Sequence, residues 1–355
     1  MGCRTNVDFA ARLITWQKCH GRHGLPWQES RDPYAIWLSE IMLQQTQVAA
    51  VIPYYQRFLS RFPDIASLAG ASLDEVLAHW SGLGYYSRAR NLHRAAWLIT
   101  SGHGGAFPHD FEHIVALPGI GRSTAAAVSV FAFGQRRAIL DGNVKRVLAR
   151  HLGVAGYPGE SAVAATLWQA AENLLPQCEV ETYTQALMDL GATVCTRARP
   201  SCAACPVSRD CAASRDGRIA ELPTPKPKKT QPQRRTVMLL LCHEGEIFLE
   251  KRPPAGIWGG LWSFPEIAPG QRAEDYCLAH FGVHAECAEP LPQLAHTFTH
   301  FKLEITPQPA MLAAKPNAVN ESAGVWLSLQ EARQAPLPAP VRKLLEQLRS
   351  ARAAP

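Results

Sequence analysis

Four cysteines lie within seventeen residues of this chain and constrain its fold more than any other feature. They are Cys195, Cys202, Cys205 and Cys211, in the segment CTRARPSCAACPVSRDC, with the spacing C-x6-C-x2-C-x5-C. Four thiolates on one short segment can enclose a single metal centre, because zinc ions and iron–sulfur clusters both bind cysteine sulfur. The segment therefore predicts a loop folded around a metal centre.

Three kinds of site compete for these cysteines. Disulfides are disfavoured, because the opening sequence MGCRTNVDFAARLITWQKC lacks the apolar core of a secretory signal and the remaining cysteines are scattered. Structural zinc sites usually have two tight C-x2-C pairs, whereas this segment has one. The wide–tight–wide spacing favours a [4Fe–4S] cluster, with zinc as the open alternative.

Length and charge indicate a globular protein with more than one domain. The chain has 355 residues, of which 47% are hydrophobic and 19% charged, which excludes a disordered protein. Residues 1–221 carry 21 basic against 18 acidic side chains, and residues 222–235 carry five basic and no acidic ones. Residues 236–355 carry 10 against 12. The position of the positive charge favours a polyanionic partner such as nucleic acid, and no apolar run is long enough to span a membrane.

The segment LPTPKPKKTQPQRR, residues 222–235, is the clearest boundary in the chain. Its four prolines favour an extended linker between two domains. Before it, apolar residues recur at three- and four-residue intervals between short Gly- and Pro-rich breaks, which is typical of an all-α domain. After it, the pattern changes to that of an α+β domain. The elements expected there are a hairpin over 235–253, helices over 272–282 and 338–349, and a strand over 296–310.

A glycine-rich turn interrupts the helical pattern at LPGIGRSTAAAVSVFAFG, residues 117–134. We expect Gly119 and Gly121 to adopt positive φ and a helix to begin near Arg122. The backbone N–H groups at the start of that helix would then bind a phosphate without reading base sequence. An ordinary connection between two helices is the alternative interpretation.

Two carboxylates stand out. Asp141 directly precedes a helical pattern that includes Val144 and Val147, which predicts an N-cap held ionised and fixed in place. Glu40 has largely apolar neighbours at helical spacing, so partial burial would keep its proton at neutral pH. A capping role alone for Asp141 and a solvent-facing position for Glu40 are the competing interpretations.

Taken in order, the motifs of this chain resemble those of MutY-type adenine DNA glycosylases. These belong to the helix-hairpin-helix, iron–sulfur glycosylase superfamily that includes endonuclease III. The motifs are WLSEIMLQQTQV, GLGYYSRARNL, LPGIGRSTA, LDGNVKRVLAR, the cysteine segment and FTHF. The resemblance covers nearly the whole chain and implies a multidomain protein. Its parts would be an all-α catalytic domain over 1–221, with the helix-hairpin-helix near 117–134 and the cluster loop over 195–211, a linker over 222–235, and a Nudix-like domain over 236–355.

The resemblance also implies roles for individual residues. Glu40 matches the general acid that protonates adenine, Asp141 the carboxylate that stabilises the sugar cation, and Asn143 its polar neighbour. The four cysteines match the ligands of a [4Fe–4S] cluster. Trp27 and Gln185 fall where the adenine pocket is expected. The implied contacts with DNA come from Gln45, Leu83, Tyr85, Gly119, Gly121, Ser123 and Lys145.

Two further features refine the expected activity. Ser123 occupies the position of the lysine that cuts the strand in related bifunctional enzymes, which predicts base removal without strand cleavage. The Nudix-like domain lacks the glutamate set of Nudix hydrolases after WGGLWSFPE, so we expect no hydrolase there. Phe298, Thr299 and His300 match the family's 8-oxoguanine recognition loop, with Thr299 in place of a common serine. A core aromatic is the alternative interpretation of Phe298.

The expected function is the removal of adenine paired with 8-oxoguanine or guanine in double-stranded DNA, by a monomer in the bacterial cytoplasm. Two alternatives stay open: an endonuclease III-like glycosylase/lyase, and a non-catalytic DNA-binding iron–sulfur protein. The cysteine segment begins 54 residues after Asp141. We therefore expect it to dock DNA through Arg197 and Arg199, away from the residues assigned to chemistry.

Overall fold

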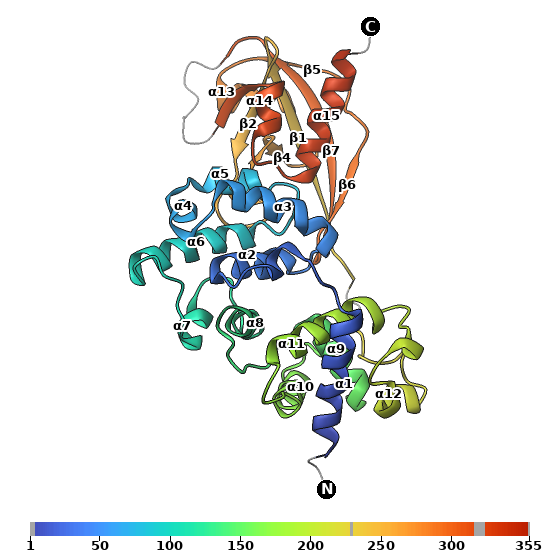
Figure 1. Ribbon diagram of the computed structural model, residues 1–355. Coiled ribbons are helices and arrows are strands. Elements are labelled where there is room, and N and C mark those ends of the chain that lie inside the picture. The colour runs from blue at the N-terminus through green and yellow to red at the C-terminus, as the bar shows by residue number, and fades with distance from the viewer. Residues whose placement is uncertain (1–3, 228–229, 316–323, 354–355) are drawn as a thin grey trace. The chain divides into compact units, whose positions relative to one another are not determined.

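The computed structural model describes residues 4–227, 230–315 and 324–353, which form two compact units (Figure 1). The first unit consists of the described residues of Met1–Gly70 and Asn91–Lys228, and the second of those of Ala71–Arg90 and Lys229–Pro355. A short segment from within the helical half of the sequence therefore belongs to the second unit. No helix among the described residues is long and apolar enough to cross a membrane.

The regular secondary structure of the first unit, within its described residues, consists of helices alone, as the sequence predicts. It contains α1 (Arg4–His20), a 3-10 turn at Pro26–Gln28, α2 (Pro33–Leu43), α3 (Val48–Arg61), α4 (Ile65–Gly70), most of α6 (Ser87–Gly102), α7 (Phe111–Ala116), α8 (Arg122–Phe133), α9 (Gly142–Leu152), α10 (Ser161–Asn173), α11 (Val180–Asp189) and α12 (Ala212–Arg215). A π-helical turn at Leu190–Val194 and 3-10 turns at Cys202–Ala204 and Ser208–Asp210 carry the chain through the cysteine segment.

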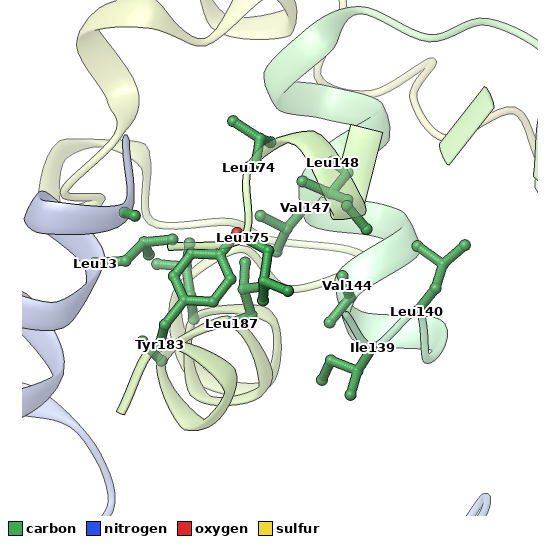
Figure 2. Packing of buried hydrophobic residues seen from close by; sticks show 14 of the residues in the cluster. Leu13, Ile139, Leu140, Val144, Val147, Leu148, Leu174, Leu175, Tyr183 and Leu187 are labelled. Carbon is green, nitrogen blue, oxygen red and sulfur yellow. The ribbon is translucent and has the colours of Figure 1, made fainter. Parts of the chain in front are cut away.

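Helix α9 owes its position to an apolar stripe. Val144, Val147 and Leu148 recur at helical spacing and are buried against Tyr183 and Leu187 of α11 (Figure 2). Each aliphatic side chain buried in this way contributes roughly 1.5–3 kcal/mol to folding. The stripe fixes the rotation of α9 about its own axis.

The second unit is built on one mixed sheet. Its strands are β1 (Gln233–His243), β2 (Glu246–Lys251), β3 (Trp262–Ser263), β4 (Glu266–Ile267), β5 (Ala285–Cys287), β6 (Leu294–Thr297), β7 (Lys302–Leu312) and β8 (Gly324–Ser328), in the order β3-β2-β1-β7-β5. Strand β4 pairs with β1, β6 with β7 and β8 with β2. The β1–β7 pairing is parallel and the others are antiparallel. The helices of this unit are α5 (Leu73–Trp80), α13 (Ala273–Phe281), α14 (Leu329–Gln334) and α15 (Ala339–Ala353).

The hairpin and both helices expected in this region are confirmed, and one strand is not. Strands β1 and β2 pair through a two-residue turn in which Glu244 and Gly245 both have positive φ, as hairpin turns of this length require. Residues 296–310, expected as one strand, are instead split between β6 and β7. The turn between them is closed by the Phe298 N–H, which donates to the Phe301 carbonyl oxygen over 2.9 Å. Both arms of a hairpin keep the same alternation, so the sequence pattern runs through the turn unchanged.

The segment 71–90 is fixed to the C-terminal part of the second unit by polar contacts. These are an ion pair of Asp74 with Lys251 (2.7 Å) and hydrogen bonds of Ser81 with Arg342 (2.7 Å), Tyr86 with the Leu337 carbonyl (3.1 Å) and Arg90 with the Gly259 carbonyl (2.6 Å).

Part of the expected linker 222–235 is also ordered. Leu222 is buried and its carbonyl accepts from Arg150 Nε (2.7 Å), while Thr224 Oγ1 accepts from the Gly156 N–H (3.1 Å). At its other end, β1 begins at Gln233, because β1 pairs with β7 from that residue onward. The tether is therefore shorter than the proline-rich stretch suggests.

Candidate active site

A pocket of about 440 Å³ in the first unit brings together three of the predicted site residues. Glu40 of α2, Trp27 of the 3-10 turn and Gln185 of α11 all line it. The pocket is large enough for a purine base and has a polar and an apolar part. The structure therefore unites residues from three separate stretches of the sequence.

Helix α2 holds Glu40 at the wall of the pocket, among mostly buried neighbours. The helix starts after Asp32, whose side chain accepts from the Tyr34 N–H (3.0 Å), and nearly all of its residues are buried. Burial, together with the negative charge of Asp141, raises the pKa of Glu40 from its usual 4.5 to about 8. Glu40 is therefore mostly protonated at neutral pH and can act as a proton donor.

Asp141 is the N-cap of α9, as the sequence predicts, and its Oδ1 accepts from the Val144 N–H over 2.7 Å. Burial raises the pKa of Asp141, while the backbone N–H groups of Val144 and Asn143 and the cations of Arg146 and Lys145 act in the opposite direction. The negative charge of Asp141 is also the second cause of the raised pKa of Glu40. The two carboxyls therefore interact electrostatically.

Arg146 connects this pair to the cysteine segment. Its Nη2 donates to Asn143 Oδ1 (2.8 Å) and to the Gly191 carbonyl (2.6 Å), and its Nε donates to the Cys195 carbonyl (2.8 Å). A Cβ at Gly191 would come within 2.5 Å of Asn143 Cβ, so a glycine there allows the turn after α11 to approach α9. The cysteines line a different cavity from Glu40, but Arg146 of α9 bonds to both the cysteine segment and Asn143.

The four cysteines line one cavity of about 30 Å³ whose other walls are mostly apolar. Arg150 of α9 is only 4% exposed and closes it, donating to Cys195 Sγ (3.4 Å) and to the carbonyl oxygens of Thr196 (2.7 Å) and Arg197 (3.1 Å). Burial raises the pKa of the Cys205 thiol to about 11, so a thiolate there needs a positive centre nearby.

This donor set fits a cluster ligated by thiolates alone. Four cysteines line the cavity, and the lining residues include no carboxylate. Within the described residues, no group of three His, Cys, Asp or Glu side chains is arranged to hold a single metal ion.

The hairpin turn agrees only partly with expectation. Helix α8 begins at Arg122 and Gly119 has a φ of 79°, as predicted, but Gly121 has a φ of −90°. The expectation for Gly121 was wrong because it is the N-cap of α8, where the chain is extended. A Cβ at Gly121 would meet no atom within 4 Å, so this backbone lies open. Ser123 Oγ accepts from the Leu140 N–H (3.0 Å) and ties α8 to the residue before Asp141.

Lys145 lies in a second, strongly basic pocket of the first unit. This pocket has a volume of about 470 Å³, and its charged lining residues are all cations: Lys145, Arg146, Arg150, Arg197 and Lys226. Such a concentration of positive charge suits a phosphate backbone. Sequence reasoning missed Arg146, Arg150 and Lys226, although the i, i+4 spacing of the two arginines in VKRVLAR was a usable signal.

The residues expected to enter the duplex adopt unusual backbone conformations. Gln45 follows α2 in the first unit with a φ of 58°, and Tyr85 in the second unit has a φ of 50°. Residues other than glycine rarely adopt this conformation, and such positions cluster at functional sites. Tyr85 is 45% exposed, whereas Leu83 is buried.

Phe298, Thr299 and His300 form the turn between β6 and β7. Phe298 stacks on the buried ring of Phe301 (centroids 4.5 Å apart) and contacts Trp258 (5.3 Å). Thr299 and His300 are exposed, and Thr299 Oγ1 lies 3.4 Å from His300 Nδ1. The turn therefore presents a hydroxyl and an imidazole on an aromatic base.

Comparisons with known proteins bear on both parts of the chain. Residues 38–173 match the HhH-GPD superfamily of base excision DNA repair proteins, and residues 236–347 match the NUDIX domain. The adenine DNA glycosylase of Buchnera aphidicola subsp. Acyrthosiphon pisum is 36% identical, with 96% of this chain and 98% of that protein covered. The adenine DNA glycosylase of Rattus norvegicus is 33% identical, with 95% and 77% covered. A solved thermostable thymine-DNA glycosylase is 29% identical, with a TM-score of 0.54 and 60% and 98% covered.

Proposed function

Because this chain belongs to the adenine DNA glycosylase family, we propose that it removes adenine paired with 8-oxoguanine or guanine in double-stranded DNA. The reaction is hydrolysis of the N-glycosidic bond and leaves an abasic site. The observation that carries the proposal is the electrostatic pairing of Glu40 and Asp141. The first is an acid whose pKa is raised to about 8 in a base-sized pocket, and the charge of the second contributes to that shift.

Cleavage of this bond needs an acid to protonate the leaving base and a negative charge to stabilise the sugar cation, and the two carboxyls can supply these. The adenine leaves the stack, at a cost of a few kcal/mol, and enters the pocket beside Trp27 and Gln185. Glu40 donates its proton to N7 of the base, and the C1′–N9 bonding pair leaves with the adenine. The sugar becomes an oxocarbenium ion, which the negative charge of Asp141 stabilises.

Water then completes the reaction. Its oxygen bonds to C1′ while Glu40, now a carboxylate, accepts the proton that water loses, so the acid is regenerated. Asn143 holds its place at the start of α9 through Arg146. With Ser123 at the hairpin, no lysine is present at the position of the lyase nucleophile, and we therefore propose no strand cleavage.

DNA would be held by groups that do not read base sequence. The turn at Gly119, the open backbone at Gly121, the start of α8, and the basic pocket with Lys145 and Arg197 are suited to phosphates. Gln45, Leu83 and Tyr85 would contact the duplex beside the extruded base. Phe298, Thr299 and His300 would recognise 8-oxoguanine on the opposite strand, the hydroxyl and imidazole supplying hydrogen bonds.

We further propose that Cys195, Cys202, Cys205 and Cys211 bind a [4Fe–4S] cluster. Bound there, the cluster would supply the positive centre that keeps the four thiolates deprotonated and their loop closed. The support is a cavity lined by all four cysteines and held on α9 by Arg150. Iron and acid-labile sulfide near four each per chain, with absorbance near 400 nm, are expected. Zinc in place of iron would refute the assignment.

The deciding experiment is base release under single-turnover conditions from a duplex with one adenine opposite 8-oxoguanine. We expect an abasic site that becomes a strand break only after added alkali, and a near-complete loss of release in Glu40→Gln with duplex binding retained. Cleavage without alkali, together with action on oxidised pyrimidines, would indicate an endonuclease III-like enzyme. Tight binding with no release of adenine would indicate a DNA-binding protein without catalysis.

A further inference from the structure

Asp189, the last residue of α11, is a completely buried carboxylate that receives three hydrogen bonds and forms an ion pair. Its Oδ2 accepts from the Arg22 N–H (2.7 Å) and its Oδ1 accepts from Arg22 Nε (2.8 Å), while Arg22 Nη2 lies 2.7 Å from Oδ1 in the ion pair. The third hydrogen bond comes from the side-chain amide of Gln185, whose Nε2 donates to Oδ1 over 2.8 Å. Partners of this number and kind are what a buried charge requires.

This arrangement fixes the direction of the Gln185 amide. The oxygen and nitrogen ends of a glutamine amide have nearly the same shape, and the surrounding hydrogen bonds decide which way it points. A carboxylate only accepts hydrogen bonds, so Gln185 must turn its NH2 group toward Asp189. Its carbonyl oxygen Oε1 is then the end left for the pocket, and no donor among the described residues binds it.

The same carboxylate also anchors another wall of the pocket. Arg22 lies in the loop between α1 and the 3-10 turn that carries Trp27. Within this loop, Gln28 Nε2 donates to the Arg22 carbonyl (3.1 Å), and the Leu25 N–H donates to Gln28 Oε1 (3.1 Å). Asp189 therefore holds Gln185 from one side and the Trp27 loop from the other.

We infer that Asp189 and Arg22 are positioning residues that set the selectivity of the pocket for a 6-amino purine, through the orientation of Gln185. Adenine has an N–H donor at its 6-position, whereas guanine and hypoxanthine have an acceptor there. The carbonyl oxygen of Gln185 can accept a hydrogen bond from the 6-amino group of adenine. Against guanine or hypoxanthine it would face another acceptor, and neither oxygen would gain a hydrogen bond. The inference rests on the proposed function and adds to it Asp189, which does not line the pocket, and Arg22, which does.

The test compares three bases opposite 8-oxoguanine: adenine, hypoxanthine, and purine without a 6-substituent. Asp189→Asn is nearly isosteric, but its amide can donate to Gln185 and let that side chain turn over. We expect release of adenine to slow by about 10- to 100-fold relative to the native protein, the effect of one mispaired buried group. Release of unsubstituted purine should slow far less, and the preference for adenine over hypoxanthine should shrink. An equal slowing of all three bases would show that Asp189 is only structural and would overturn the inference.

A double-mutant cycle provides the matched control. Gln185→Leu removes the amide on which Asp189 acts, so adding Asp189→Asn to it should cause no further loss of adenine preference. Independent, additive losses would contradict the inference. If Asp189→Asn does not fold, Arg22→Lys keeps the charge and the backbone bond but loses the guanidinium fork, and should weaken adenine preference in the same direction. Unchanged preference in Arg22→Lys would then count against the inference. Failure of the native protein to release adenine or purine would instead refute the proposed function.

Discussion

Arg146 donates a hydrogen bond from Nε to the carbonyl oxygen of Cys195 over 2.8 Å. The same guanidinium bonds to Asn143, two residues after Asp141, so the cysteine loop and the catalytic helix share one support. Loosening of the loop should therefore disturb Asp141 without any change in the pocket itself.

We predict that Arg146→Ala lowers both cluster content and activity. The substitution leaves the carbonyls of Cys195 and Gly191 and the Asn143 amide without this donor, at a cost of about 2–4 kcal/mol. Iron content, thermal denaturation and single-turnover base release measure the effect. Arg146→Lys should restore only part of the cluster content and activity, because an ammonium group cannot reach all three acceptors at once. Native iron content and rate in Arg146→Ala would disprove the coupling.

Asp141→Asn should separate capping from catalysis. Asparagine caps helices about as well as aspartate, so the hydrogen bond with the Val144 N–H and the stability of α9 should survive. The negative charge beneath the sugar is lost, and base release should fall by roughly a thousandfold or more. Melting temperature and single-turnover rate are compared on the same preparation. A large drop in stability with activity preserved would reverse the assignment.

The raised pKa of Glu40 predicts that the native protein loses stability as pH rises from 4.5 to about 8, whereas Glu40→Gln does not. Folding shifts this pKa from 4.5 to about 8, so the folded state binds the proton more tightly than the unfolded chain. The stability contributed by that proton is complete below pH 4.5 and is lost as pH rises through about 8. Glu40→Gln should not show this loss.

The rate of the native protein should follow the same titration, with base release falling about tenfold per pH unit above pH 8 because the acid is then deprotonated. Chemical denaturation and single-turnover kinetics across pH 6–10 measure both quantities. A rate independent of pH over this range would exclude Glu40 as the donor.

Ser123→Ala should cost about 1–2 kcal/mol of stability, because it removes the acceptor of the Leu140 N–H directly before Asp141. Base release should slow with it, since the turn leading into α9 loses its tie to α8. Ser123→Thr keeps the hydroxyl and serves as the control. Equal behaviour of the alanine and threonine variants in urea unfolding would show that this bond contributes nothing.

In the turn between β6 and β7, Thr299→Ala and Phe298→Ala should behave differently. Thr299 is exposed, so its loss should reduce the preference for 8-oxoguanine over guanine while leaving the melting temperature nearly unchanged. Phe298 packs on Phe301 and Trp258, so its loss should reduce both preference and stability. If Thr299→Ala prefers 8-oxoguanine over guanine as strongly as the native protein does, the result would argue against recognition by this turn.

Local patterns predicted what depends on local structure. The cap at Asp141, the start of α8, the burial of Glu40 and the β1–β2 hairpin follow from spacing and residue type within a few positions. Contacts between distant residues could not be predicted in this way. Arg22 and Asp189 are 167 positions apart, and nothing near either residue indicates the other. The turn after Phe298 was missed because a hairpin preserves the alternation of a strand.

The assignment of residues 71–90 to the second unit affects how truncated forms of this protein should be designed and interpreted. A fragment that ends at the linker keeps this segment but lacks Lys251, Gly259, Leu337 and Arg342, which bind it. Tyr85, which we propose contacts the duplex, lies on that segment. Loss of 8-oxoguanine preference in such a fragment would therefore have two causes: the proposed recognition turn is missing, and segment 71–90 has lost the residues that bind it. Point substitutions in the full-length chain can separate these two effects, whereas truncation cannot.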